Sequence, residues 1–334
     1  MRGLLRQVSE RGRTIGFLVH DNVTMMDIAG PADVFHHANA FGADYKTVMV
    51  SADGQAKRAA NGHYLMVETT AGRAGALDTV LVPGAYGMVA KPFEQELVDA
   101  VSHLTNDARR IASVCTGAFL LAHAGLLNYR NATTHWTQVE RFTKSFPLVN
   151  VVPDALFVQD DPIITSAGIS SGVDLALFMV EDDYGPDVAR AVVRQMVIFN
   201  QRPGGQSQRS VAVGASSSRD HVLRKLLDQI TAEPAADYSI DAMAAMTNLS
   251  ASSLTRRFQE ATGTSPARYV EKVRIEAAQA MLQRGATVAA TAAATGFGSA
   301  ETLRRVFTQK VGMSPSLYLE RLMPRHDGAG HLPA

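Results

Sequence analysis

Residues 110–124 read RIASVCTGAFLLAHA, and this stretch predicts the fold of the first half of the chain. The apolar run Arg110–Val114 is typical of a buried strand, and Thr116–Ala124 has an apolar helical pattern. Cys115 therefore lies on a sharp turn between a strand and a helix N-terminus, an arrangement called a nucleophile elbow. N–H groups at a helix N-terminus favour a thiolate, but a free cysteine more often serves as a small apolar filler. Both interpretations stay open from position alone.

The segments around this stretch repeat the alternation of strand and helix. Further short β-branched runs occur at Thr14–Val19, Thr47–Ser51 and Thr79–Val82, and patterns of helical period occupy residues 31–41 and 92–104. The alternation predicts an α/β doubly wound fold, in which helices cover both faces of a mostly parallel sheet. Loops at the carboxyl ends of such strands meet along one edge, where ligands bind.

Several chemically active residue types follow the predicted strands. Asp27, in MDIAGP, is expected to begin a helix with Pro31 near its first turn, and VPGAYG at 82–87 is expected to offer backbone N–H groups to an anion. His135, in ATTHW, is the candidate base for Cys115. Asp27 as a simple helix cap and His135 as a core histidine are the structural alternatives. The candidate ligand-binding residues are Asp27, Gly84, Ala85, Tyr86, Cys115, Thr116, His135 and Ser166.

The second half of the chain contains an internal repeat at an offset of 49 residues. Nine positions match: Ala244, Ser250, Leu254, Arg256, Phe258, Gly263, Ser265, Pro266 and Tyr269 recur as Ala293, Ser299, Leu303, Arg305, Phe307, Gly312, Ser314, Pro315 and Tyr318. Each copy predicts a short helix, a tight turn and a second helix that opens on a serine N-cap, Ser250 or Ser299. The pattern predicts an all-α domain with two helix-turn-helix units.

The outward faces of the two second helices carry residue types that bind DNA. In a helix-turn-helix the second helix enters the major groove, where Arg binds guanine and Ser or Thr contacts several bases. The candidate DNA-binding residues are Ser252, Ser253, Thr255, Arg256, Arg257, Ala300, Glu301, Thr302, Arg304 and Arg305. Two units in one chain can read major-groove faces about 34 Å apart. The alternative is a helical bundle whose arginines form a solvated face.

Length, composition and charge limit the class of protein to which the chain can belong. A length of 334 residues fits about two domains, and 46% hydrophobic with 19% charged residues is typical of a globular protein. The net charge of zero divides into minus five for residues 1–200 (16 basic, 21 acidic) and plus five for residues 201–334 (16 basic, 11 acidic). One cysteine forms no internal disulfide and is too few for a cysteine-based zinc site. No secretory signal or membrane span is evident, so we expect a cytoplasmic protein without metal or cofactor.

These observations define the expected organisation. The α/β domain is placed at residues 13–200 and the DNA-binding domain at 221–323. Residues 201–220, rich in Gly, Ser, Gln and Arg, are expected to be a linker, and residues 324–334 a disordered tail.

The motifs resemble known families in both halves. GTSPARYVEKVR and GMSPSLYLERL, closing the two repeats, resemble the AraC/XylS transcription regulators, while SVCTGAFLLAHAGLL, ATTHW, MDIAGP and ITSAGISSGVD resemble the PfpI-like branch of the class I glutamine-amidotransferase superfamily. Together they resemble GlxA-type transcription regulators. The resemblance implies a flavodoxin-like domain that senses a small nitrogen-containing or carboxylated metabolite and forms homodimers. It also implies a seven-helix domain for double-stranded DNA, with a long helix at Pro266–Arg284.

Two other functions compete with the regulator. In an enzyme of the hydratase or amidase type, carry-over from the family assigns catalysis to Cys115 and Asp27, with His135 as the candidate base. Because Thr116 rather than histidine follows the cysteine, the resemblance argues against an amidase and less against a hydratase. The third possibility is a thiol redox sensor, which requires a thiol of low pKa.

Overall fold

The computed structural model describes residues 12–85, 87–90, 92–198, 201–208 and 220–322. The chain divides into two compact units, Met1–Gln208 and Arg209–Ala334. Of the linker expected at 201–220, residues 201–208 pack on the first unit and Asp220 caps the first helix of the second. Residues 209–219 and the expected tail lie outside the described residues.

The first unit is built on a mostly parallel sheet of seven strands in the order β10-β11-β7-β6-β1-β2-β5. Strand β10 runs antiparallel to β11, and the other described pairs in this sheet are parallel. The strands are β1 Arg13–Leu18, β2 Tyr45–Ser51, β5 Thr69–Thr70, β6 Thr79–Val82, β7 Arg110–Val114, β10 Phe157–Asp160 and β11 Ile163–Ser166. The four predicted strands are confirmed, each to within two residues. Two small ribbons pair β3 Lys57–Arg58 with β4 Tyr64–Leu65, and β8 Asn131–Ala132 with β9 Asn150–Val151.

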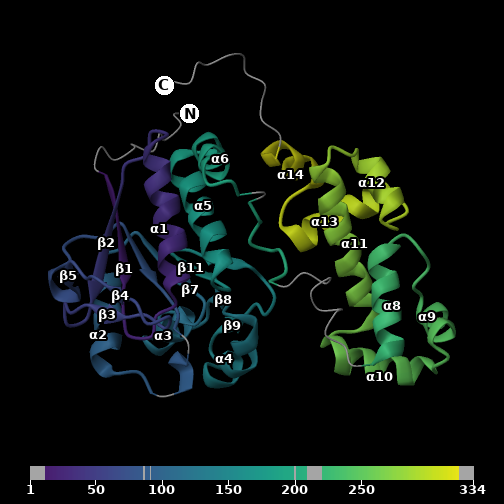
Figure 1. Cartoon of the computed structure of the whole chain (residues 1–334), viewed down its shortest axis with the longest axis horizontal. Helices are drawn as coiled ribbons and strands as arrows, with labels where there is room; N and C mark the ends of the chain where they lie inside the picture. Colours follow the sequence, from purple (N-terminus) through teal and green to yellow (C-terminus); the bar gives the residue numbers. More distant parts are fainter. Residues whose placement is uncertain (1–11, 86, 91, 199–200, 209–219, 323–334) are drawn as a thin grey trace, which may run out of the picture. The chain divides into compact units, whose positions relative to one another are not determined.

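Helices cover both faces of this sheet (Figure 1). One layer contains α1 Met25–Asn39, α5 Ser170–Tyr184 and α6 Pro186–Gln195; the other contains α2 Gln95–Thr105, α3 Gly117–His123 and α4 Val139–Ser145. Three short 3-10 turns occur at Ala71–Arg73, Met88–Ala90 and Trp136–Gln138. Neighbouring strand residues point to opposite faces, so Phe17 packs in the first layer and Leu18 in the second. The predicted doubly wound fold is therefore confirmed.

The start of α1 differs from the prediction. The helix begins at Met25 with Thr24 as its N-cap, so Asp27 is in the first turn and Pro31 lies inside the helix. The expectation that Asp27 begins the helix with Pro31 near its first turn was wrong. A proline inside a helix costs about 3 kcal/mol, and burial of the apolar face that includes Val34 and Phe35 offsets it.

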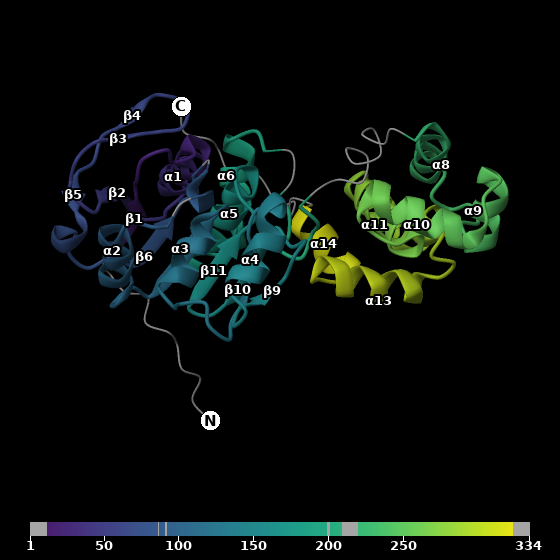
Figure 2. The ribbon, with the colours of Figure 1, turned by 90° about the horizontal axis from the view of Figure 1, so that it is seen from below.

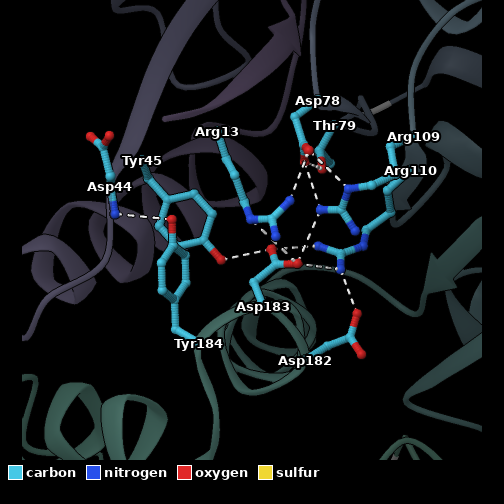
Figure 3. Close-up of polar contacts among 10 residues, drawn as sticks. All are labelled: Arg13, Asp44, Tyr45, Asp78, Thr79, Arg109, Arg110, Asp182, Asp183 and Tyr184. Atoms are coloured by element: carbon cyan, nitrogen blue, oxygen red, sulfur yellow. Dashed lines mark hydrogen bonds and ion pairs between the residues drawn. The ribbon is translucent and has the colours of Figure 1, made fainter. Parts of the chain in front are cut away.

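A cluster of charged residues joins the end of α5 to the amino ends of the strands (Figure 3). The Asp183 carboxylate, whose side chain is 2% exposed, lies 2.9 Å from Arg110 Nη2 and 3.0 Å from Arg109 Nη2. It also accepts a hydrogen bond of 2.8 Å from the Tyr45 hydroxyl. Because Arg110 begins β7 and Cys115 follows its last residue, the cluster anchors the sheet at the end opposite the elbow.

The second unit contains seven helices within the described range. They are α8 His221–Ala232, α9 Ile240–Thr247, α10 Ala251–Thr262, α11 Pro266–Gln283, α12 Val288–Ala294, α13 Ala300–Val311 and α14 Pro315–Leu322. The long helix α11 supplies Tyr269 to one apolar core and Leu282 to a second, and so joins the two halves (Figures 1 and 2). The predicted long helix at 266–284 is confirmed to within one residue.

The internal repeat is also a repeat of packing. Phe258 lies against Tyr269 with ring centroids 5.3 Å apart, and Phe307 lies against Tyr318 at the same separation. Each of these pairs closes one apolar core around the second helix of its unit. The sequence repeat therefore encodes two equivalent helix-turn-helix units.

Candidate functional site

The elbow residue is the central feature of the α/β unit. Cys115 has φ +59°, a left-handed conformation that is uncommon for a residue with a side chain. Its N–H donates to the Ser166 carbonyl at 3.0 Å, which fixes the end of β7 against the end of β11. The predicted turn between strand and helix is thus present. Contacts with the surrounding chain stabilise its strained backbone conformation.

Glycine on a neighbouring loop allows the elbow to be packed closely. Gly168 follows β11 with φ +114°, and a Cβ built on it would lie only 2.4 Å from Cys115 Cβ. No side chain fits there without moving the elbow. This requirement explains the glycine in the ITSAGIS motif.

Asp27 joins three segments at the elbow. Its side chain is fully buried and accepts hydrogen bonds from Gly84 N at 3.1 Å and Ile169 N at 2.9 Å. Helix α1, the loop after β6 and the loop after β11 therefore meet at one carboxylate. Burial raises the pKa of Asp27 to about 6, and the two backbone hydrogen bonds oppose that rise. The alternative of a helix cap is wrong, since Thr24 has that position.

The pKa of the thiol bears on the two interpretations of Cys115 that the sequence left open. Burial and the negative charge of Asp27 raise the pKa of Cys115 to about 12, although a hydrogen bond from Thr116 favours the thiolate. Burial therefore favours the neutral thiol over the thiolate. Desolvation outweighs the helix N-terminus because the group is largely closed off from water.

The loop after β6 uses its amides within the protein. Gly84 N donates to Asp27, and Ala85 N donates to Thr116 Oγ1 at 3.0 Å. These two N–H groups are therefore not free to bind an anion, contrary to the prediction from the sequence. Tyr86, the next predicted ligand-binding residue, lies outside the described residues.

The ATTHW segment contacts the elbow through threonine. Thr134 Oγ1 donates to the Cys115 carbonyl at 2.9 Å, while His135 Nδ1 lies 2.8 Å from Thr137 Oγ1. Burial lowers the pKa of His135, so its imidazole is neutral near pH 7. Its role as a base for the thiol stays a prediction. Ser166 Oγ is buried and has no hydrogen-bond partner among the described residues, so it is available to a ligand that reaches the end of β11.

One histidine at this edge of the sheet was not among the site residues predicted from the sequence. His20 follows β1, is 7% exposed, and lies 3.1 Å through Nε2 from the Pro83 carbonyl. Burial lowers its pKa. Its position directly after the predicted strand Thr14–Val19 was the available signal.

The second helices of the two helix-turn-helix units form the candidate nucleic-acid interface. Ser250 Oγ accepts from Ser253 N at 3.2 Å and Ser299 Oγ accepts from Thr302 N at 3.1 Å, which confirms both predicted N-caps. The exposed members of the predicted DNA-binding set are Ser252, Thr255, Arg256, Glu301, Arg304 and Arg305, and Ser253, Arg257, Ala300 and Thr302 are partly exposed.

Hydrogen bonds and ion pairs within the unit occupy part of this face. The Thr255 hydroxyl donates to the Ala251 carbonyl, and Arg256 lies 3.0 Å from Glu260. Arg304 lies 3.8 Å from Glu301. These surface pairs contribute little to stability, so exchanging them for phosphate or base contacts carries a small penalty.

Comparison with known proteins assigns the α/β unit. The DJ-1/PfpI family matches residues 13–182, which is just over half of the chain. The chain belongs to the DJ-1/PfpI family. A second match, described as a helix-turn-helix domain, covers residues 243–321.

Relatives of this DJ-1/PfpI protein include both regulators and an enzyme. The HTH-type transcriptional regulator GbdR of Pseudomonas aeruginosa is 27% identical over 91% of this chain and 83% of its own length. The regulator GlxA of Rhizobium meliloti is 30% identical over 61% of this chain and 64% of its own length. Isonitrile hydratase of Pseudomonas putida is 32% identical over 54% of this chain and 77% of its own length. The expected GlxA-type architecture is confirmed, and the regulators favour transcription control over catalysis.

A solved structure supports the fold. A ThiJ/PfpI family protein from Pseudomonas syringae matches 75% of this chain and 98% of its own, with TM-score 0.52 and 21% identity. The likeness at this identity establishes the architecture only.

Proposed function

We propose that this DJ-1/PfpI protein is a transcription regulator that binds double-stranded DNA through α10 and α13 and responds to a small metabolite bound in the α/β unit. The observation that carries the proposal is the pair of capped second helices, each fixed on its own aromatic core, in a region matched by a helix-turn-helix domain. Arg305 on α13 and Arg256 on α10 occupy equivalent positions of the repeat. Two such helices suit two neighbouring major-groove segments.

The effector site is proposed at the elbow. The candidate ligand-binding residues come from loops that Asp27 and Cys115 draw together at the carboxyl edge of the sheet, where doubly wound folds bind ligands. A buried carboxylate and the unpartnered Ser166 hydroxyl suit a small compound that bears an amine or a carboxylic acid. Homodimerisation through this unit is part of the same proposal and follows from the family resemblance.

The DNA-binding part is tested with the full chain. Sheared genomic DNA is first selected for duplexes that bind the protein. The affinity of the protein for these duplexes is then measured by fluorescence anisotropy at 50 and 200 mM salt. We expect Arg305→Ala to weaken binding by about 1–3 kcal/mol and salt to weaken wild-type binding steeply. The matched control is Arg141→Ala, an exposed arginine on α4 of the other unit. Equal binding by the two variants, or binding that salt leaves unchanged, contradicts the proposal.

The effector part is tested by unfolding. Trp136 is the single tryptophan of the chain and lies in the α/β unit, so its fluorescence reports on that unit. Amines, amino acids and carboxylates are screened, because a ligand at one hundred times its dissociation constant stabilises by about 2.7 kcal/mol. A compound that raises the unfolding temperature and is recovered unchanged supports the sensor. A panel without any stabilising member contradicts the proposed ligand class.

An enzyme is the second candidate, and one observation favours it. Isonitrile hydratase of Pseudomonas putida is 32% identical over 54% of this chain. A hydratase of this kind would require Cys115 and Asp27, with His135 as a further candidate. The test is turnover of an isonitrile by wild type and Cys115→Ser. Turnover by wild type alone supports the enzyme, and absence of turnover in wild type leaves the regulator as the sole function proposed.

A further inference from the structure

Residues 201–208, which we call the strap, connect the last helix of the α/β unit to the segment before the DNA-binding unit. Their first attachment is an ion pair with α5. Arg202 Nε and Nη2 lie 3.0 and 2.6 Å from Asp174 Oδ2, and Arg202 N donates to Asp174 Oδ1 at 2.9 Å. The Asp174 side chain is 5% exposed, so this contact is buried on the carboxylate side.

The middle of the strap lies against the chain that enters β10, and one isolated antiparallel bridge pairs Ser207 with Ala155. Leu156 N donates to the Gln206 carbonyl at 2.9 Å, and Phe157 N donates to the Gly204 carbonyl at 3.2 Å. A Cβ on Gly204 would lie 2.7 Å from the Phe157 ring, so the strap approaches closely only because this residue is glycine. The strap is therefore fitted to the unit and is not a free tether.

The last attachment is the Gln208 side chain. Its Nε2 lies 2.9 Å from the Thr134 carbonyl, 3.2 Å from Thr133 Oγ1 and 3.1 Å from the Ala155 carbonyl. Its Oε1 is buried and has no hydrogen-bond partner among the described residues. An unsatisfied buried acceptor destabilises the attached state, so the strap is held by a contact that a modest perturbation can release.

Both ends of the strap connect to the elbow, Gln208 through Thr134 and Arg202 through Ser170 and its neighbour Ile169. Thr134, which accepts from Gln208, donates through its own hydroxyl to the Cys115 carbonyl at 2.9 Å. At the other end, Arg202 Nη2 donates to Ser170 Oγ at 3.0 Å. The neighbouring residue Ile169 donates its N–H to Asp27.

We propose that the strap is the output element of the sensor: a change at the Cys115 elbow releases or tightens residues 201–208 through Thr134 and Ser170. Release of the strap changes the residue at which the chain leaves the α/β unit on its way to the DNA-binding unit. The biological meaning of this coupling rests on the proposed regulator function. The coupling itself is a property of the α/β unit and needs neither DNA nor the natural effector for its test.

The first experiment perturbs the strap and reads the elbow. Cys115 is the only cysteine, so the rate of its alkylation by iodoacetamide at pH 9, followed by mass spectrometry of the full chain, reports on the elbow alone. Each substitution removes a contact that holds Thr134 or Ser170 in place beside the elbow, so Gln208→Ala and Arg202→Ala are each expected to speed alkylation about fivefold or more. The matched control is Gln159→Ala, because Gln159 is exposed on β10 and its amide donates to Asp161.

The second experiment modifies the elbow and measures amide exchange at the residues that hydrogen-bond to the strap. It uses wild-type protein, so the result does not depend on the folding of a variant. Wild-type protein alkylated to one adduct is compared with unmodified protein by hydrogen–deuterium exchange. We expect faster exchange at Leu156 and Phe157, whose acceptors are in the strap, and unchanged exchange in the core of β1. Equal exchange in the two samples, or alkylation rates that match those of Gln159→Ala, overturns the coupling. Either result leaves the DNA-binding proposal intact, which separates the two failures.

Discussion

Asp27 gives the most direct test of the elbow's electrostatics. Its carboxylate is fully buried, and its pKa in the folded chain is raised from 3.8 to about 6. The folded chain therefore holds the proton more tightly than the unfolded chain does. The free energy of unfolding must rise as the pH falls from neutral, and the stabilisation must vanish as the pH rises through the folded pKa.

The magnitude follows from that difference in pKa. A shift of about two units corresponds to about 3 kcal/mol over the full titration, of which about 1.3 kcal/mol falls between pH 7 and pH 5. For a unit of this size, 1.3 kcal/mol moves the unfolding temperature by about 3 to 5 °C. Asp27→Asn removes the titration. It also loses one of the two hydrogen bonds to Gly84 N and Ile169 N, a loss that does not depend on pH.

The assay is thermal unfolding of full-length wild type and Asp27→Asn, followed by Trp136 fluorescence at pH 5, 6 and 7. Subtracting the two curves cancels every other titrating group. We expect the free energy of unfolding of the wild type, relative to that of the variant, to rise by about 1.3 kcal/mol as the pH falls from 7 to 5. A difference that is flat, or that moves the opposite way as an ordinary ion-paired carboxylate would, refutes the argument from burial.

Three further predictions use other parts of the chain. Alkylation of Cys115 should accelerate about tenfold per pH unit from pH 7 to pH 10, because the pKa of its thiol is about 12; a plateau below pH 9 would mean a reactive thiolate. Asp183→Asn should destabilise the α/β unit by about 3–5 kcal/mol in urea unfolding, because it leaves Arg109 and Arg110 without this buried carboxylate; an unchanged midpoint contradicts that reading. Ser299→Ala should lower the stability of the DNA-binding unit by about 1 kcal/mol in circular dichroism melts, and an effect no larger than that of Ser252→Ala would exclude a capping role.

Local patterns were sufficient to predict most of the fold. The strands that were predicted are short β-branched runs, and β6 and β7 at the centre of the sheet are buried at every position, as a parallel sheet covered on both faces requires. The second helices of the repeat were located at their serine N-caps, because capping is a bond between a residue and its own neighbours in the chain. Such features depend little on the rest of the molecule.

Features set by distant partners were not predictable in the same way. Pro31 inside α1 misled the prediction, because packing of α1 against the sheet overrides the local preference of proline. The state of the thiol was left open for a similar reason: a helix N-terminus is visible in the sequence, while burial beside Asp27 is a property of the folded unit. The strap was predicted to be part of a linker, because Gly, Ser and Gln form no period even though Arg202, Gly204, Gln206 and Gln208 are hydrogen-bonded to the α/β unit.

The raised pKa of the thiol also bears on why a strained elbow suits a sensor. A redox sensor of the expected kind, or a nucleophile active at neutral pH, needs a thiolate, and a thiol with a pKa of about 12 supplies almost none. The backbone of Cys115 has another use, because its N–H binds the Ser166 carbonyl and its carbonyl binds the Thr134 hydroxyl. The elbow thus holds together two segments that carry candidate ligand-binding residues, Ser166 and His135, and Thr134 in turn holds Gln208 of the strap. A residue in a sparsely populated conformation stores free energy that a small change of contacts can release, and this property suits the proposed role of the elbow in the response to a ligand.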